Sequence, residues 1–170
     1  FYFQSGETRK SLKLFKDSFA LAQKLDNRNG MAVNAANMAR AVFTLSASGG
    51  VAVETQGVIE YIQKAIASSE GAASLILHNH SGILLHLQAF HSKESVSSKS
   101  SDVERVKASL AGLRNNKTRI EKSIQHFEVA LKLAKGDEEK YFSKIKQNLE
   151  LTRHLAGVKD KKTAWIPPLN

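Results

Sequence analysis

The sequence predicts an all-α fold in which six to seven helices pack as antiparallel hairpins. Three observations lead to this fold class. The two prolines, Pro167 and Pro168, lie at the far end of the chain, so no proline interrupts a helix before them. Apolar residues recur at intervals of three and four, which is the spacing of one helical face. Clusters of Gly, Ser, Asn and Asp separate these stripes and supply turns.

Four helices are predicted in the first half of the chain. One spans about 7–26, and the next follows a turn at 26–30 and ends at 48–50. Two more follow, the second of which is apolar over more than half of its circumference, so we expect it to be the most buried. The four stripes consist of Leu12, Phe15, Phe19, Ala22 and Leu25; Val33, Met38, Val42 and Leu45; Val58, Ile59, Ile62 and Ile66; and Leu75, Ile76, Ile83, Leu84, Leu87 and Phe90.

Up to three helices are predicted in the second half of the chain. A capping box at 101–104 starts a short helix that ends near Asn115. A further helix runs from Ile120 to Gly136. The acidic residues at 137–139 favour the start of the last helix, because negative charge is stabilised at a helix N-terminus. The apolar stripe of this helix is Phe142, Ile145 and Leu149, and it extends to about Ala156.

The composition fits one globular domain. The chain has 170 residues, of which 42% are hydrophobic and 24% charged, and it contains no cysteine. This length allows a sizeable core, and the lack of cysteine excludes disulfides, thiolate zinc sites and cysteine nucleophiles. Polar residues interrupt the longest uncharged stretches, so we expect no transmembrane helix, and no signal peptide is visible. We therefore expect an intracellular protein, cytoplasmic or nuclear.

Three segments stand apart from the predicted helical domain at 7–156. Residues 1–6 resemble the site of a viral protease that removes expression tags, and they are left out of the fold prediction. Residues 92–101 include six serines, which predicts a mobile insertion loop. The tail at 157–170 contains the apolar, proline-bearing segment Trp165–Leu169, which suits docking into a groove of this chain or of another.

Three of the predicted helices share a pattern that points to a repeat. Each carries a bulky residue three positions before an alanine: Phe19 and Ala22, Ile62 and Ala65, and Phe127 and Ala130. A small residue lets a neighbouring helix approach closely while the bulky residue fills the space beside it, as stacked helical hairpins require.

These residues resemble the tetratricopeptide repeat family. Ile59–Ile66 follows the family's pattern for the second helix of a hairpin, and Asn37–Ala39 with Val42 is similar to its pattern for the first helix. Ser81–Gly82 with Leu85 is similar to that first-helix pattern again. The repeats are 43 and 65 residues apart rather than about 34, which implies insertions around 46–53 and within 92–118.

The resemblance implies a non-enzymatic adaptor that binds a peptide or partner helix. The first helices of successive hairpins would form its groove. Asn37 matches an asparagine that relatives use to hold a terminal carboxylate, but His80 and Ile76 stand where the rest of that clamp would place Arg and Lys. The predicted groove residues are Asn34, Asn37, Arg40, His78, Asn79 and His80.

No cofactor or metal site is predicted. His78 and His80 point about 200° apart on a helix, and neither Cys nor a carboxylate lies between 71 and 93 to complete a metal site. The adjacent acids at 137–139 are explained by a helix N-terminus. No phosphate loop, nucleophile elbow or zinc-protease motif is present, so we expect no enzymatic activity.

The net charge leaves a second hypothesis open. The formal charge of +9 is divided unevenly, with +2 on residues 1–91 and +7 on residues 92–170. Such a field favours acidic partners of any kind. Four basic residues in nine positions form a candidate patch, which would suit a bundle that binds nucleic acid or an anionic membrane: Arg114, Lys117, Arg119 and Lys122.

Overall fold

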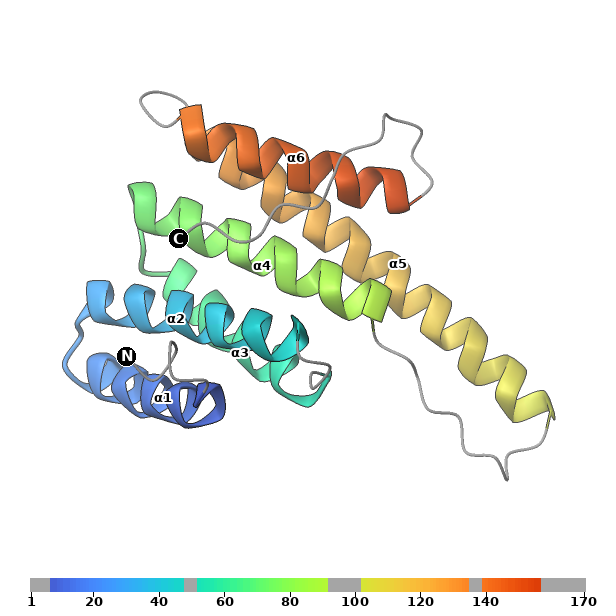
Figure 1. Cartoon of the computed structure of the whole chain (residues 1–170), viewed down its shortest axis with the longest axis horizontal. Coiled ribbons are helices and arrows are strands. Elements are labelled where there is room, and N and C mark those ends of the chain that lie inside the picture. The colour runs from blue at the N-terminus through green and yellow to red at the C-terminus, as the bar shows by residue number, and fades with distance from the viewer. Residues whose placement is uncertain (1–6, 48–51, 92–101, 135–138, 157–170) are drawn as a thin grey trace.

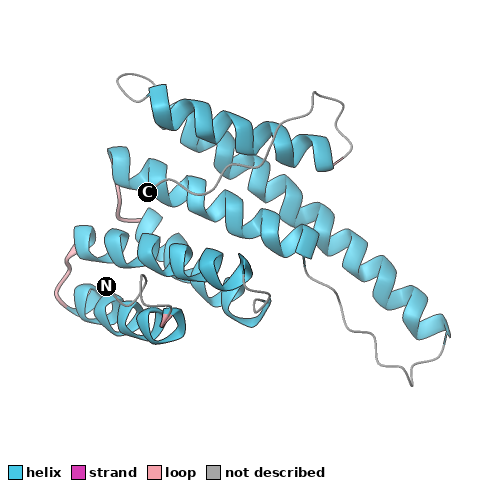
Figure 2. Ribbon diagram, in the orientation of Figure 1, coloured by secondary structure: helices cyan, strands magenta, loops and turns pink. Residues whose placement is uncertain are grey.

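The computed structural model describes residues 7–47, 52–91, 102–134 and 139–156, which form six helices and no strand (Figure 2). The predicted all-α fold is confirmed. The expected tag remnant, serine-rich insertion and C-terminal tail lie outside the described residues. The helices are α1 (Thr8–Lys24), α2 (Arg28–Ala47), α3 (Ala52–Ile66), α4 (Gly71–His91), α5 (Asp102–Leu133) and α6 (Glu139–Leu155).

The break predicted near Asn115 is wrong, because α5 continues through it for 32 residues. The segment between the two predicted helices has neither Gly nor Pro, and its residues cost a helix only a few tenths of a kcal/mol each, about 0.7 at most. Within it, Arg119 Nη1 donates a hydrogen bond to Asn116 Oδ1 at 3.2 Å, one turn away. Intrinsic propensity therefore offers no reason for the helix to stop.

The turn predicted between the first two helices is present. Asp26 adopts a left-handed backbone conformation with φ of 49°, which an aspartate tolerates better than most residues. Asn27 then accepts a hydrogen bond at its Oδ1 from the backbone N–H of Gly30, at 2.8 Å. This bond satisfies one of the free amides at the start of α2, as an N-cap asparagine does.

Helix α4 lies at the centre of the fold. It packs against α2, α3, α5 and α6, whereas α1 packs against α2 at one edge (Figure 1). Helix α2 contacts α4, and α4 in turn contacts α6. In Figure 1, α3 lies behind α2, and α5 lies behind α6. The chain thus places α2, α4 and α6 along one side, with α3 and α5 on the other.

The core follows the predicted stripes, with three exceptions. Helix α4 is the most buried of the six, as expected, and its Leu75 and Leu84 are at most 1% exposed. Leu25 is 68% exposed because α1 ends one residue before it. Val33 is 51% exposed on a side of α2 that no other helix covers, and Phe142 on α6 is 40% exposed.

Candidate partner-binding surface

One line of side chains on α2 faces solvent. Val33, Asn37, Arg40 and Thr44 lie within about 60° of one another around the helix, because their spacings are close to whole turns. Val33 and Thr44 are exposed, and Asn37 and Arg40 are partly exposed. Since α1, α3 and α4 pack against the rest of α2, these four residues form its uncovered side, which we call the α2 face.

Hydrogen bonds order the polar groups of the α2 face. Arg40 Nη1 donates to Asn37 Oδ1 at 3.0 Å, and Thr44 Oγ1 donates to the Arg40 carbonyl oxygen at 3.1 Å. Asn34, beside the face, donates from Nδ2 to the Gly30 carbonyl oxygen at 2.8 Å. A guanidinium held next to an amide is a good receptor for a carboxylate, because arginine supplies several N–H donors in a fixed plane.

The other three predicted groove residues do not join the α2 face. Asn79 and His80 are 0% exposed, so no partner reaches their side chains without a rearrangement of the helices. Neither amide atom of Asn79 has a hydrogen-bond partner among the described residues. His78 is partly buried and contacts α5. His78, Asn79 and His80 therefore lie where helices pack against one another.

His80 is held as a neutral ring. Its Nδ1 lies 2.8 Å from the Ile76 carbonyl oxygen and therefore donates to it, and its ring lies against Phe43, with ring centroids 5.6 Å apart. The pKa of His80 is lowered to about 4, mainly by burial; the hydrogen bond to Ile76 opposes this lowering, and the positive charge of Arg40 adds to it.

His78 pairs with a histidine that the sequence analysis did not single out. Its Nδ1 lies 2.8 Å from Nδ1 of His126 on α5, so one nitrogen carries a hydrogen and donates it to the other. Burial lowers the pKa of both rings, and that of His126 falls to about 4 with contributions from His78 and from the charge of Lys122. Nothing in the spacing of the two residues along the chain signals this contact.

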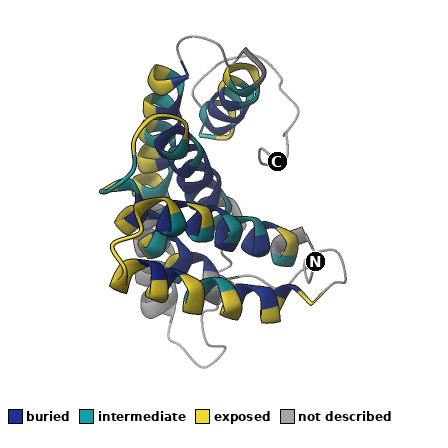
Figure 3. Cartoon of the chain, turned by 90° about the vertical axis from the view of Figure 1, so that its left-hand side faces the viewer, coloured by how far each residue is buried: buried dark blue, intermediate teal, exposed yellow. Residues whose placement is uncertain are grey.

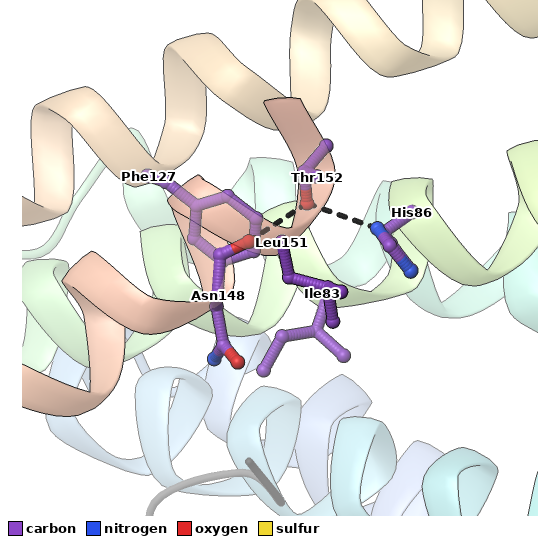
Figure 4. Close-up of a pocket in the computed structure, with 6 residues that line it drawn as sticks. All are labelled: Ile83, His86, Phe127, Asn148, Leu151 and Thr152. Atoms are coloured by element: carbon purple, nitrogen blue, oxygen red, sulfur yellow. Dashed lines mark hydrogen bonds between the residues drawn. The ribbon is translucent and has the colours of Figure 1, made fainter. Parts of the chain in front are cut away.

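A small hollow lies where α4, α5 and α6 meet (Figure 4). Its empty volume is about 160 Å³, including the part open to solvent. Thr152 Oγ1 donates to the Asn148 carbonyl oxygen at 2.9 Å and lies 2.9 Å from His86 Nδ1, which therefore donates to Thr152. In this arrangement His86 does not accept the hydroxyl proton, so the pair is not a base and a nucleophile.

The predicted basic patch does not form a single face. All four residues lie on α5, and on a helix Lys117 points about 140° away from Lys122. Lys117 and Lys122 are exposed and Arg119 is partly exposed, while the side chain of Arg114 lies outside the described part of the chain. Arg119 and Lys122, by contrast, lie about 60° apart around the helix.

Comparison with known proteins gives no relative: no family model, curated protein or solved structure matches the chain. Within the described residues, no three His, Asp or Glu side chains gather where they could hold a metal ion. None of the described helices combines the length and apolarity needed to cross a bilayer. The α2 face and the helix arrangement are therefore the observations from which a function can be inferred.

Proposed function

We propose that this chain is a non-enzymatic adaptor built as a tetratricopeptide-like array, and that the α2 face binds a peptide or helix carrying a carboxylate. The observation that carries the proposal is the order of helix contacts. In an array of hairpins, the first helix of each hairpin contacts its own second helix and the first helix of the next hairpin.

The contacts in this chain follow that order if α2, α4 and α6 are first helices and α1, α3 and α5 are second helices. Helix α2 then contacts its own second helix, α3, and the next first helix, α4. In the same way α4 contacts α5 and α6, and the remaining pairs join each second helix to the following first helix. The sequence patterns at Phe19, Ile62 and Phe127 indicate the second-helix role for α1, α3 and α5, and those at Asn37 and Gly82 indicate the first-helix role for α2 and α4.

Two buried alanines support this assignment. Ala65 on α3 and Ala130 on α5 are 0% exposed, at the positions where the repeat pattern calls for a small side chain. Each follows by three residues a fully buried bulky side chain, Ile62 or Phe127. This is the combination that close helix packing in a hairpin array requires.

The chemistry of the α2 face favours an acidic peptide. Arg40 and Asn37 offer charge-assisted and neutral N–H donors side by side, and Val33 adds an exposed apolar contact about one turn before Asn37 along the same line. His80 and Ile76 replace the Arg and Lys of the family's carboxylate clamp, so a carboxylate would be held by Asn37 and Arg40 on α2 alone.

The test compares binding by three proteins: the parent, the double variant Asn37→Ala with Arg40→Ala, and the control Lys146→Ala, which removes an exposed charge from α6. Proteins captured from a lysate by the parent are identified, and their acidic segments are made as labelled peptides. We expect the double variant to lose most of the affinity for such a peptide while the control retains it. Equal binding by all three would disprove the role of the α2 face.

The same series tests the alternative that the basic second half binds nucleic acid or an anionic membrane. The parent is titrated with a single strand, a duplex and anionic vesicles at two salt concentrations. Binding whose affinity falls steeply with salt and does not change in the α2 double variant would favour the alternative. The separation of Lys117 from Arg119 and Lys122 around α5 makes us expect little such binding.

A further inference from the structure

The outer side of α1 carries apolar residues that the fold does not bury. Leu14, Leu21 and Leu25 are 45%, 58% and 68% exposed. Helix α1 lies at the edge of the molecule and packs on α2, and its exposed residues lie along the side away from the core (Figure 3). Leu14 and Leu21 lie on α1 and Leu25 directly follows its last residue, so the three exposed leucines share one side of the helix rather than being scattered over the surface.

These leucines have the spacing of a helix-pairing seam. Leu14, Ser18, Leu21 and Leu25 follow one another at intervals of four, three and four, which are alternate d and a positions of a heptad repeat. Lys10, Asp17 and Lys24 occupy the g positions along one side of this line, and all three are exposed. We call the four seam positions with these three charged residues the α1 seam.

The repeat pattern does not account for the α1 seam. When α3 is aligned with α1 by placing Ile62 on Phe19, the positions of the three leucines are taken by Gly57, Lys64 and Ser68. A helix of the same type therefore packs in this fold without apolar residues on its outer side.

We propose that α1 pairs with an amphipathic helix of another protein that carries leucines in its seam, acidic residues opposite Lys10 and Lys24, and a basic residue opposite Asp17. The leucines would supply the apolar contact, and the alternating charges would select the partner, as flanking charges do in coiled coils. This surface lies on a different helix from the α2 face and goes beyond the adaptor function proposed for that face.

A second copy of the chain fits the α1 seam poorly. In an antiparallel pair of α1 helices centred on Asp17, Lys10 of one copy would face Lys24 of the other, and the two Asp17 carboxylates would face each other. All three pairs of like charge are unfavourable. In a parallel pair, the charged flank would face e positions, where Phe15 and Ala22 are turned toward the protein core. The charges therefore favour a different chain.

A lipid surface is also a poorer fit. Helix α1 carries five basic residues and one acidic residue, so its charge does not disfavour an anionic surface, but its apolar line is only one residue wide. Helices that lie in a membrane interface present a broad apolar face with a basic polar side.

The experiment uses a labelled synthetic peptide of three heptads with Leu at a and d, Glu opposite Lys10 and Lys24, and Lys opposite Asp17. The g positions of α1 would face e positions of a parallel partner and g positions of an antiparallel one, so the peptide carries these charges at both e and g. Because the order Lys, Asp, Lys is the same in both directions, this one peptide tests both pairings. We expect saturable binding in fluorescence anisotropy, weakened about tenfold or more by Leu21→Gln. Lys24→Glu should weaken binding, and a peptide with Lys at the facing position should restore it.

The control is Leu155→Gln, which changes an exposed leucine at the end of α6 and should leave peptide affinity unchanged. Since Leu21 is exposed, Leu21→Gln should melt within a degree or two of the parent, so a loss of binding does not reflect unfolding. No saturable binding by the parent, equal losses in both leucine variants, self-association abolished by Leu21→Gln, or binding to anionic vesicles that Leu21→Gln abolishes would each overturn the proposal.

Discussion

Replacing Gly82 with alanine tests the closest contact between α4 and α5. A Cβ atom on Gly82 would lie 2.8 to 2.9 Å from three ring atoms of Phe127 on α5. The ring has little room to retreat, because Phe127 is only 1% exposed. Moving α4 away from α5 would instead stretch the hydrogen bond from Ser123 Oγ to the Gly82 carbonyl oxygen, which is now 2.7 Å long.

The expected magnitude is the difference between two opposing effects. Alanine is favoured over glycine inside a helix by about 1 kcal/mol, whereas forcing a methyl group into a packed core costs about 1 to 3 kcal/mol. We therefore expect Gly82→Ala to lower the free energy of unfolding by up to about 2 kcal/mol, or several degrees in Tm. Gly57→Ala is the matched control, because nothing lies within 4 Å of its Cβ position, and it should stabilise the protein.

Urea and thermal unfolding of the parent, both glycine variants, Phe127→Leu and the double variant Gly82→Ala with Phe127→Leu would measure these effects. If the ring is the obstacle, Gly82→Ala costs less in the leucine background, with a coupling energy of about 1 kcal/mol or more. The reasoning fails if Gly82→Ala is as stabilising as Gly57→Ala, or if its cost is the same in both backgrounds.

Three further predictions concern packing, pH and a buried hydrogen bond. Ala65→Leu and Ala130→Leu should each cost about 1 to 3 kcal/mol in urea unfolding, whereas Leu at the exposed Ala20 should stay within about 0.5 kcal/mol of the parent. The pKa of His80 is about 4 in the folded state and 6.5 in the unfolded state. The neutral ring therefore contributes at most about 3 kcal/mol to the free energy of unfolding above pH 6.5, and this contribution is lost as the pH falls toward 4. Urea midpoints between about pH 7 and pH 4.5 should fall accordingly, less steeply in His126→Asn, and a flat profile would contradict the buried neutral rings. Thr152→Val should cost about 1 to 3 kcal/mol by leaving His86 Nδ1–H without its acceptor, and Thr152→Ser should retain most of the stability.

Local signals in the sequence were sufficient for most helices of this fold. The turn at 26–30 contains an Asx cap that depends only on Asn27 and its neighbours, so its chemistry is readable from the sequence. The boundary near Asn115 could not be read in the same way. A polar stretch with moderate helix propensity is compatible with both a loop and an exposed helix, and the choice depends on contacts that lie far apart along the chain.

The polar residues of α4 show why the candidate site was only partly predictable. Asn37 and Arg40 lie close enough along one helix for their pairing to follow from helical spacing. His78 is paired with a residue 48 positions away, and His86 with one 66 positions away. Such contacts depend on how the helices cross, which the period of a single helix does not contain. Asn79 and His80 were assigned to a groove by resemblance, but both are buried, so a partner does not reach them in this arrangement of the helices.

The two halves of the chain hold their helices together in different ways, and this bears on where partners bind. Helix α2 buries five alanines that let its neighbours approach closely: Ala32, Ala35, Ala36, Ala39 and Ala41. The C-terminal helices are joined by directed polar contacts instead, including His78 to His126, Ser123 to Gly82, and Arg153 to Glu128 at 2.7 Å. Directed contacts fix the register between helices, because they fail when one helix slides along another. His78, Gly82 and His86 of α4 are thereby committed to neighbouring helices. Helices α1 and α2, packed mainly through apolar and small residues, keep charged and apolar side chains on their outer sides, where the proposed partners would bind.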